Sequence, residues 1–389
     1  MTFTDQSVSA RRWRELLSRP GFSWPVSIED WAQAASEKLA AGPRGYIFGG
    51  AGAGATRDAN TEAFSRWRIV PRVLATPAKR DLSVTIFGQE YTSPLFLAPL
   101  GVLTIAHREG DLAVAAAARD LGMTMIVSTA GSVPMETVMS KTPGLSGWFQ
   151  LYWVNNRDLT ASFVGRAEAA GYGVLVVTVD TPMLGWREAD LASAYSPFAD
   201  GHGIGHFITD PVFRQLIGFD PDTNLPRAGE EMMKLFANPG LVWEDLQWLR
   251  SLTGMPILLK GVLHPDDAAR ALDLGLDGVI VSNHGGRQVD GCVAALDALV
   301  TIREHLPAEV PVLLDGGIRR GPDVVKAMAL GATAVLVGRP YAYGLTVGGR
   351  QGVHEVLSNL LADTDSVLAL SGRQSITGLD PSMLSSAHG

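Results

Sequence analysis

Eight short apolar runs rich in Val, Ile and Leu follow one another from residue 95 onward, separated by longer Ala-rich amphipathic stretches. They cover residues 95–100, 124–129, 147–153, 174–180, 256–262, 278–284, 311–317 and 334–340. An alternation of apolar strands with amphipathic helices is typical of βα units around a parallel sheet. Eight such units favour an α/β fold of the closed (β/α)8 TIM barrel type over an open doubly wound sheet, which usually has fewer strands.

The stretches between the runs carry helix start and stop signals. Each has Asp in its first turn and ends at Gly, and they cover residues 110–122, 158–171, 265–275 and 322–331. Acidic side chains favour the N-terminus of a helix and glycine favours its end. We therefore expect a helix in each stretch, and a further helix at residues 28–39.

The regular spacing breaks once, between the fourth and fifth runs, where about 75 residues replace a single short helical connection. We expect a lid insertion at about 188–240, and the Pro-, Gly- and Asp-rich centre at 197–240 predicts a mobile loop over the C-terminal rim of the barrel, where enzymes of this fold keep their active sites. Residues 1–94 are predicted to form an N-terminal helical extension that packs on the barrel, residues 95–375 the barrel, and residues 376–389 a C-terminal tail.

Composition and charge exclude several classes of protein. The 40 acidic residues outnumber the 32 Lys and Arg residues, and a net charge of -8 does not favour binding to nucleic acid or anionic lipid. The apolar segment 95–106 is interrupted by Pro99 and Gly101, so no membrane span is expected. Cys292 is the single cysteine, which excludes an internal disulfide, and the start of the chain does not resemble a signal peptide. We expect a cytoplasmic protein.

Two motifs are weaker than they look. The glycine-rich residues 49–54 lack the preceding strand and the Lys-Ser/Thr ending of a phosphate-binding loop, so we predict no nucleotide site there. His202 and His206 have helical spacing for a metal, but the glycines around them disfavour a helix. We assign both histidines to the lid loop and predict no metal site.

Polar side chains end nearly every apolar run, where a buried strand would otherwise be expected to stay apolar. They are Ser128, Gln150, Tyr152, Thr178, Asp180, Lys260, Ser282, His284, Asp315 and Arg339. Any one of them could be a helix cap or part of the core. Because the carboxyl ends of barrel strands meet at one rim, the whole set predicts a single polar cavity.

The last two strands are followed by features that suit a phosphate group. Residues 315–319 and 338–340 combine glycine turns with arginines, which supply backbone N–H groups and guanidinium donors. Lys260 ends an apolar strand and would be costly to bury without an anionic partner. It could be a Schiff-base nucleophile or the counter-charge to an electron-rich ring.

His284 and its neighbours indicate acid–base chemistry. A histidine at a strand end can accept a proton at neutral pH, and Arg287, three residues on, can bind a carboxylate through two hydrogen bonds. Asp180 could orient the imidazole and stabilise its protonated form, and Arg187 offers a second guanidinium. A base with two arginines predicts a small carboxylic acid that is deprotonated beside its carboxylate.

The motifs that carry these residues resemble those of the FMN-dependent α-hydroxy acid oxidising enzymes. They are SNHGGRQ at 282–288, TVDTP at 178–182, LKG at 259–261, DGGIR at 315–319 and VGRP at 337–340. The resemblance extends in order over roughly residues 28 to 375. It implies FMN as the cofactor and a small 2-hydroxy acid as the substrate.

The resemblance also implies a role for each residue. FMN would be held by Pro99, Leu100, Gly101, Ser128, Gln150, Thr178, Lys260, Ser282, Asp315, Gly316, Gly317, Arg319, Gly338 and Arg339. Tyr46, Arg187 and Arg287 would bind the substrate carboxylate, Tyr152 and His284 would meet its hydroxyl group, and Asp180 would support His284. Gly101 would leave room beside the flavin. Only Tyr46 has no signal of its own, because an N-terminal tyrosine is normally a packing residue.

Within that family the chain resembles the lactate 2-monooxygenase branch. The similar segments are APLG at 98–101, WFQLY at 148–152, GWR at 185–187, TDPVF at 209–213 and VWEDL at 242–246. This branch implies oxidation of L-lactate with O2 to acetate, CO2 and water, through a keto acid that stays caged while the peroxide reacts. If the keto acid leaves first, the same chemistry gives an oxidase that releases the keto acid and hydrogen peroxide. A dehydrogenase that uses another acceptor is a third form.

Two other classes of protein, an aldolase and a non-catalytic binding protein, would leave some of these residues without a role. A barrel aldolase using Lys260 as a Schiff base would have no use for the pair His284 and Arg287. A non-catalytic flavin- or hydroxy-acid-binding protein would not need a base at all. Since relatives assemble as tetramers or octamers, the resemblance also implies a homo-oligomer, and the acidic residues of the lid argue against the membrane anchor that some relatives carry there.

Overall fold

Eight parallel strands close into a barrel in the computed structural model, which describes residues 7–19, 24–75 and 80–387. The strands, in order around the barrel, are β4 (Leu95–Leu97), β5 (Thr124–Ser128), β6 (Ser146–Tyr152), β7 (Leu175–Thr178), β8 (Ile257–Val262), β9 (Gly278–Val281), β10 (Val312–Asp315) and β11 (Ala334–Val337). The ring closes where β11 pairs with β4. Each of the eight predicted runs contains one strand, so the predicted (β/α)8 fold is confirmed.

Several strands end two or three residues before the predicted runs do. Strand β4 stops before Pro99, which has no backbone N–H to continue the ladder, and β9 stops before His284, whose φ of 59° is left-handed. Three of the predicted polar residues therefore lie in loops at the rim, namely Asp180, Ser282 and His284, and Arg339 begins the helix after β11. The others are the last residues of strands or lie near strand ends, namely Ser128, Gln150, Tyr152, Thr178, Lys260 and Asp315.

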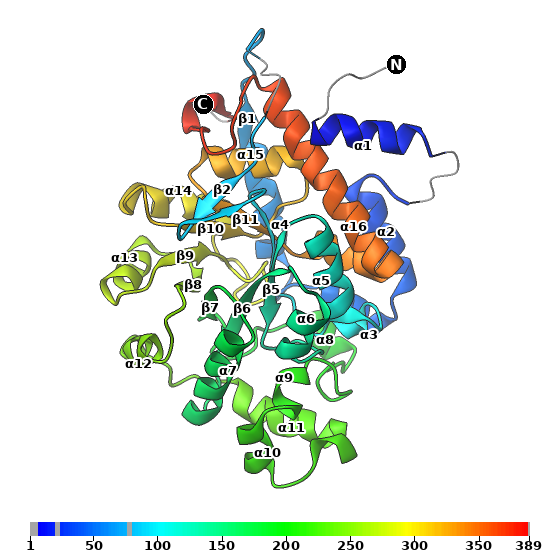
Figure 1. The fold of residues 1–389 in the computed structure, drawn as a ribbon, viewed down its shortest axis with the longest axis vertical. Helices are drawn as coiled ribbons and strands as arrows, with labels where there is room; N and C mark the ends of the chain where they lie inside the picture. Colours follow the sequence, from blue (N-terminus) through cyan, green and yellow to red (C-terminus); the bar gives the residue numbers. More distant parts are fainter. Residues whose placement is uncertain (1–6, 20–23, 76–79, 388–389) are drawn as a thin grey trace.

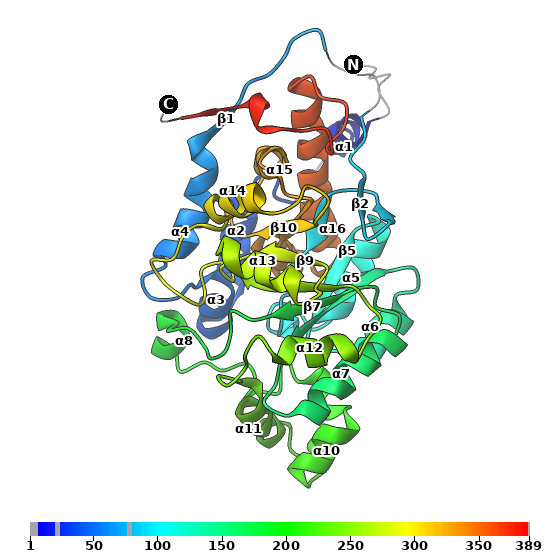
Figure 2. The same ribbon diagram turned by 90° about the vertical axis from the view of Figure 1, so that its left-hand side faces the viewer.

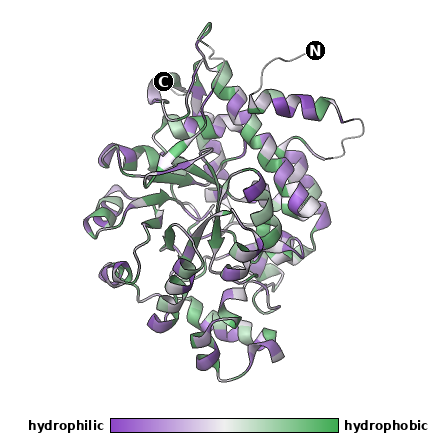
Figure 3. Cartoon of the chain, viewed as in Figure 1, coloured by the Kyte–Doolittle hydropathy of each residue, from purple (hydrophilic) through white to green (hydrophobic). Residues whose placement is uncertain are grey.

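Helices surround the barrel on its outside (Figure 1). They are α5 (Gly110–Asp120), α6 (Met135–Lys141), α7 (Arg157–Ala169), α13 (Pro265–Asp273), α14 (Ala295–His305), α15 (Gly321–Ala329) and α16 (Arg339–Leu370). The predicted helices at 110–122, 158–171, 265–275 and 322–331 are all present. In Figure 3 the barrel strands are hydrophobic while the outward faces of the helices carry hydrophilic residues, as expected when strands are buried on both faces.

The N-terminal residues add four helices against one side of the barrel. They are α1 (Val8–Leu17), α2 (Ile28–Lys38), α3 (Ala41–Phe48) and α4 (Ala55–Glu62), and α2 confirms the helix predicted at 28–39. Helices α1 and α2 pack on α16, where Trp31 is buried against Tyr343 and Val356. The division of the chain at residues 94 and 375 stays a prediction.

Two small antiparallel sheets lie outside the barrel. Strand β1 (Trp67–Ile69) pairs with β12 (Leu384–Ser386), which joins the end of the chain to its N-terminal part (Figure 2). Strands β2 (Val84–Ile86) and β3 (Gln89–Tyr91) form a hairpin that leads into β4. Among the described residues, no helix has the length and apolar character needed to cross a bilayer. The cytoplasmic location stays a prediction.

The insertion between β7 and β8 consists of short helices rather than the expected loop. Its helices are α8 (Glu188–Ala192), α9 (Gly205–Ile208), α10 (Pro211–Ile217), α11 (Leu225–Phe236) and α12 (Asp245–Ser251), and α9 to α11 lie at the end of the molecule away from both termini (Figures 1 and 2). Prolines occupy the first turns of α10 and α11, and the fully buried Asp210 caps α10 by accepting from Val212 N and Phe213 N. The Pro- and Asp-rich composition therefore encodes helix starts.

His206 is not a loop residue either. It lies in α9, completely buried, where Met135 N donates to its Nδ1 over 3.0 Å and its Nε2 lies 2.9 Å from Ser128 O. Burial lowers the pKa of His206 to about 4, so the imidazole is neutral, with its one proton on Nε2. His202 instead contacts Thr104. The described residues contain no group of three or more His, Cys, Asp or Glu side chains placed to hold a metal ion.

Candidate active site

The predicted polar residues gather around one pocket at the carboxyl ends of the barrel strands. Its lining includes Tyr46, Pro99, Leu100, Gly101, Tyr152, Thr178, Arg187, Lys260, His284, Arg287, Asp315, Gly316, Gly317, Arg319, Gly338 and Arg339. The pocket contains about 1280 Å³ of unfilled space, part of it open to solvent. Four predicted residues, Ser128, Gln150, Asp180 and Ser282, stand behind the lining and are hydrogen-bonded to it or to one another.

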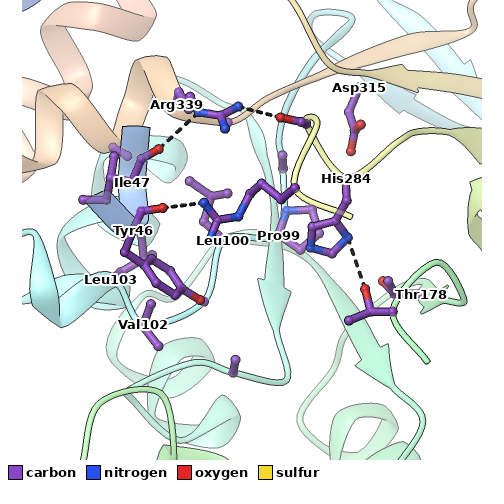
Figure 4. A pocket seen from close by; sticks show the side chains of 18 of the residues that line it. Tyr46, Ile47, Pro99, Leu100, Val102, Leu103, Thr178, His284, Asp315 and Arg339 are labelled. Carbon is purple, nitrogen blue, oxygen red and sulfur yellow. Dashed lines mark hydrogen bonds between the residues drawn. The ribbon is translucent and has the colours of Figure 1, made fainter. Parts of the chain in front are cut away.

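His284 projects into this space from the loop after β9, and Figure 4 shows Tyr46 on the other side of the pocket. Its Nδ1 lies 2.8 Å from Asp180 Oδ1, and its Nε2 lies 3.2 Å from the Tyr152 hydroxyl. Because the carboxylate accepts from Nδ1, the lone pair of the neutral ring is on Nε2, on the pocket side. Thr181, for which the sequence indicated no separate role, donates to Asp180 Oδ1 as well.

The charge states of His284 and Asp180 suit a base and the carboxylate that supports it. Burial raises the pKa of Asp180, but the nearby His284 and Lys260 and two hydrogen bonds overcome it and lower that pKa to about 2. Burial also lowers the pKa of His284, and the Asp180 carboxylate opposes this only in part. The resting pair is therefore an ionised aspartate beside a neutral imidazole, which is ready to accept a proton.

Two guanidinium groups lie next to each other on the opposite side of the pocket. Arg287 Nη1 donates to Tyr46 O and Gly49 O, its guanidinium lies 4.6 Å from the Tyr46 ring centroid, and its buried Nη2 has no partner among the described residues. Arg187 donates to Arg287 O over 3.2 Å. Burial and the charge of Arg187 lower the pKa of Arg287 to about 10. A buried cation with an unused donor fits a bound anion.

The glycine-rich segment 49–54 supports the side of the pocket that carries Arg187 and Arg287. Ala51 N donates to Gly286 O over 2.8 Å, and Gly52 N donates to Trp186 O over 2.7 Å. Asp290 accepts from Ala53 N and Thr56 N at the start of α4. The segment therefore has a structural role, and the absence of a nucleotide site there stays a prediction. It ties α3, which carries Tyr46, to the loops of β7 and β9.

A row of polar side chains crosses the barrel from β5 to β8. Ser128 Oγ donates to Gln150 Oε1, and Gln150 Nε2 donates to Thr178 Oγ1, each over 2.9 Å. Thr178 is in register with Tyr152 on one side and with Lys260 on the other. These buried groups offer donors and acceptors to one edge of a flat ligand at the bottom of the pocket.

Lys260 has two partners inside the barrel. Its ammonium group lies 3.0 Å from Asp315 Oδ2 and donates to Ser282 Oγ over 2.9 Å. Burial favours the neutral amine, but the carboxylates of Asp315 and Asp180 outweigh it and raise the pKa of Lys260. A permanently charged ammonium group is a poor Schiff-base nucleophile, so the geometry favours the counter-charge role over an aldolase.

The loops after β10 and β11 form the other end of the pocket. Gly316 and Gly317 have left-handed φ angles of 96° and 91°, which only glycine adopts easily, and they lead to Arg319 and the start of α15. Arg339 is more constrained than expected, because it donates to the carbonyls of Ile47, Gly285 and Gly49 (Figure 4 shows two of these contacts).

Polar groups of the pocket that lack a hydrogen-bond partner indicate whether FMN would fit there. Asp315 Oδ1 is buried with no partner among the described residues, and it faces the same pocket as the glycine turns and Arg319. A ribityl hydroxyl would satisfy that carboxylate, a phosphate would meet Arg319 and the turn N–H groups, and the polar row with Lys260 would meet an electron-rich ring. The donor set therefore fits FMN.

An aromatic wall from the insertion closes one side of the pocket, and the sequence did not predict it. Phe236 of α11 and Phe198 line the pocket with Tyr152, and the ring centroid of Phe236 lies 4.8 Å from that of Tyr152 and 5.8 Å from that of Phe198. Both phenylalanines are buried. Their role could not be predicted because apolar residues of an insertion have no register that places them against the barrel.

Gly101 has a packing constraint of its own. A Cβ at this position would lie 2.6 Å from Ala130 Cβ and 3.0 Å from Ala130 O. We therefore expect Gly101→Ala to lower the free energy of unfolding by about 1–3 kcal/mol. In a double-mutant cycle read by chemical denaturation, Ala130→Gly should recover part of that loss. If the changes in the free energy of unfolding caused by the two substitutions are additive, Ala130 is not the group that requires glycine at position 101.

The pocket can be compared with known proteins now that its geometry is described. Residues 35–386 match the FMN-dependent dehydrogenase family. An L-lactate oxidase of Lysinibacillus sphaericus is 43% identical over 356 residues, covering 92% of each chain, and an L-lactate oxidase of Nostoc sp. is 40% identical over 370 residues, covering 93% of this chain and 98% of the relative. A crystal structure of mandelate oxidase with a difluorinated hydroxyphenylpropionic acid has a TM-score of 0.78 at 36% identity, over 90% of this chain and 96% of that one.

These matches agree with the resemblance found in the motifs and with the residues that meet in the pocket. They confirm FMN as the cofactor and the oxidation of 2-hydroxy acids as the chemistry. The chain belongs to the FMN-dependent dehydrogenase family and is an FMN-dependent oxidoreductase that acts on 2-hydroxy acids.

Proposed function

We propose that this enzyme oxidises L-lactate with O2 and releases acetate, CO2 and water. The observation that carries the proposal is the aromatic wall, since Phe236 and Phe198 close the pocket beside Tyr152. A wall of buried rings next to the base leaves room for a small side chain such as a methyl group. The same wall would delay the departure of pyruvate, which is the condition for its decarboxylation by peroxide.

The substrate carboxylate binds to Arg287 and Arg187, with Tyr46 beside them. The free Nη2 of Arg287 supports this role, because a carboxylate would supply the missing acceptor. Holding the carboxylate there directs the hydroxyl-bearing carbon toward Tyr152 and His284, which also line the pocket. Two cations for one carboxylate would favour acids over alcohols as substrates.

His284 acts as the base. Its Nε2 accepts a proton from the substrate, and the imidazolium that results is stabilised by the Asp180 carboxylate at Nδ1. The Tyr152 hydroxyl, 3.2 Å from Nε2, orients the substrate hydroxyl group. Burial raises the pKa of Tyr152, so it remains a neutral donor throughout the pH range of the enzyme. FMN supplies the acceptor for the two electrons that the substrate loses.

The proposed FMN residues form three groups. Pro99, Leu100 and Gly101 would hold the flavin ring, and Ser128, Gln150 and Thr178 would offer hydrogen-bonding groups to its polar edge. Lys260, held by Ser282, places a positive charge beside that edge. The ribityl chain and phosphate would be held by Asp315, Gly316, Gly317, Arg319, Gly338 and Arg339. Because Arg339 already donates to three carbonyls, among them that of Gly285, Arg319 would supply more of the donors to the phosphate.

An oxidase is the second candidate, and the two relatives that bear the name L-lactate oxidase favour it. Other relatives are named FMN-dependent α-hydroxy acid dehydrogenases, which is consistent with a different acceptor. The three forms share the oxidation step and differ in the electron acceptor and in the fate of the keto acid. Product analysis therefore separates them.

The test is to turn over carbon-labelled L-lactate in air with the purified holoenzyme and to quantify acetate, pyruvate and hydrogen peroxide together. We expect acetate and CO2 with little peroxide, and we expect Phe236→Ala to shift the products toward pyruvate with an equal amount of peroxide, because the wall is opened. Pyruvate with matching peroxide from the unmodified enzyme would establish the oxidase instead. Turnover with an artificial acceptor alone would establish the dehydrogenase.

We also propose that the chain forms a homo-oligomer, a tetramer or an octamer. Exposed apolar side chains near the pocket mouth support this, namely Met183, Trp186 and Val289, which are 66%, 71% and 63% exposed. Isolated apolar residues are common on protein surfaces, but three in adjoining loops favour a protein contact. Light scattering of the purified protein gives its mass directly.

A further inference from the structure

The side-chain amide of Gln288 connects the two loops that carry the proposed substrate-binding groups. Its Nε2 donates to Asp180 O over 2.8 Å and to Met183 O over 2.9 Å. Its Oε1 accepts from Arg187 Nη2 over 3.1 Å and from Gly185 N over 3.3 Å. One amide thus makes four hydrogen bonds to the segment that follows β7.

These partners allow only one orientation of the amide. Two carbonyl oxygens face the NH2 group and two N–H donors face the carbonyl oxygen, so a rotated amide would lose all four contacts. An acid or a hydrocarbon of the same length cannot reproduce this pattern. The requirement for glutamine at this position is therefore specific.

The segment after β7 lies directly on the backbone of the β9 loop. A Cβ at Gly185 would be 2.5 Å from Arg287 O and 2.6 Å from Gln288 O, so only glycine allows this approach. Arg187 Nε also donates to Arg287 O. Backbone and side-chain contacts together align Arg187 with Arg287.

This alignment is electrostatically unfavourable without an anion. The charge of Arg187 adds to burial in lowering the pKa of Arg287. Arg187 itself is 9% exposed. Neutral acceptors such as Gln288 Oε1 can hold a guanidinium close to its neighbour without neutralising the charge that attracts the substrate.

We propose that Gln288 is a positioning residue for the substrate carboxylate, a role that rests on the proposed function of Arg187 and Arg287. It holds Arg187 beside Arg287 through its carbonyl oxygen, and through its NH2 group it fixes the backbone of Asp180, which supports His284. Gln288 is not among the described residues that line the pocket. Its loss should therefore weaken the binding of carboxylates far more than it changes the binding of FMN.

The experiment compares Gln288→Met, which keeps the length of the side chain and removes its hydrogen bonds, with the unmodified holoenzyme. The dissociation constant of oxalate, a carboxylate that does not react, is read from the flavin spectrum, and kcat and KM for L-lactate are measured in parallel. We expect the dissociation constant and KM to rise about 10-fold or more, because a hydrogen bond to a charged group is lost. We expect kcat to fall by a smaller factor than KM rises, because His284 and Asp180 keep their own hydrogen bond and Asp180 loses only the backbone contact with Gln288. Gln247→Met, on the exposed face of α12, is the matched control.

An unchanged oxalate affinity in FMN-loaded Gln288→Met would overturn the proposal. If that variant does not retain FMN, Gln288→Glu decides instead, because it keeps an acceptor oxygen for Gly185 N and Arg187 Nη2. Its new negative charge competes with the substrate carboxylate for Arg187, so oxalate should bind at least about 10-fold more weakly, and wild-type affinity would again overturn the role. An unmodified enzyme that neither binds oxalate nor oxidises any 2-hydroxy acid would overturn the proposed function itself.

Discussion

Replacing His284 with alanine is expected to slow the anaerobic reduction of the flavin by L-lactate by about 10²- to 10⁴-fold, the usual contribution of a general base. Its Nε2 is the unprotonated nitrogen on the pocket side, and Asp180 occupies the other ring nitrogen. FMN should remain bound, because His284 is not among the residues that we assign to FMN binding. The rate is read from the loss of the yellow colour after rapid mixing without oxygen.

Because the backbone conformation at His284 is unusual, a second variant is needed to separate the loss of the base from a change in the loop. Its φ of 59° is left-handed, and asparagine tolerates this conformation better than alanine does. Both His284→Asn and His284→Ala should lose the reaction, while His305→Ala, on the exposed end of α14, should not. Rapid bleaching by either His284 variant would show that another group takes the proton.

The barrel could be predicted because its strands are buried on both faces. Every residue of β5, β7, β9, β10 and β11 is buried, so each appears in the sequence as a mainly apolar run whose polar residues stand only at its ends. The polar residues that follow these runs could be assigned to one rim for the same reason. The fold thus follows from local patterns that repeat eight times.

The insertion could not be predicted in the same way. Its helices are short, and they are held by contacts with distant residues, such as Arg166 of α7 donating to the buried Asp210. Phe198, which precedes α9, and Phe236 of α11 pack against each other and belong to the same core as the barrel residues. Short helices with tertiary partners carry little periodic signal, so composition alone suggested a loop.

In the active site, the reactive groups could be predicted from the sequence, whereas the contacts that support them could not. His284, Asp180 and Arg287 were predicted from residue type and strand position, and they meet as expected. The contacts of Gln288 and Arg339 were not predicted, since both bind backbone carbonyls whose positions depend on loop geometry. Residue type predicts which group can do chemistry, whereas its supporting contacts require the three-dimensional arrangement.

Asp180→Asn should lower the rate of flavin reduction by about 10²- to 10⁴-fold, comparable with the loss of His284. The carboxylate of Asp180, whose pKa is about 2, is ionised at every working pH and lies 2.8 Å from Nδ1 of His284. An amide in its place cannot stabilise the imidazolium with a charge. The carboxylate also raises the pKa of His284 against the effect of burial, so its removal lowers that pKa further.

The sign of the pH effect follows from these shifts and separates Asp180 from a purely structural residue. Reduction requires neutral His284, so its rate rises with pH as the imidazolium loses its proton. In Asp180→Asn this rise should occur at lower pH than in the unmodified enzyme, even though the plateau is lower. The pH dependence of the anaerobic reduction rate measures both quantities, with Asp273→Asn on the outer face of α13 as the control. A rise at unchanged or higher pH would mean that Asp180 does not act on His284 through its charge.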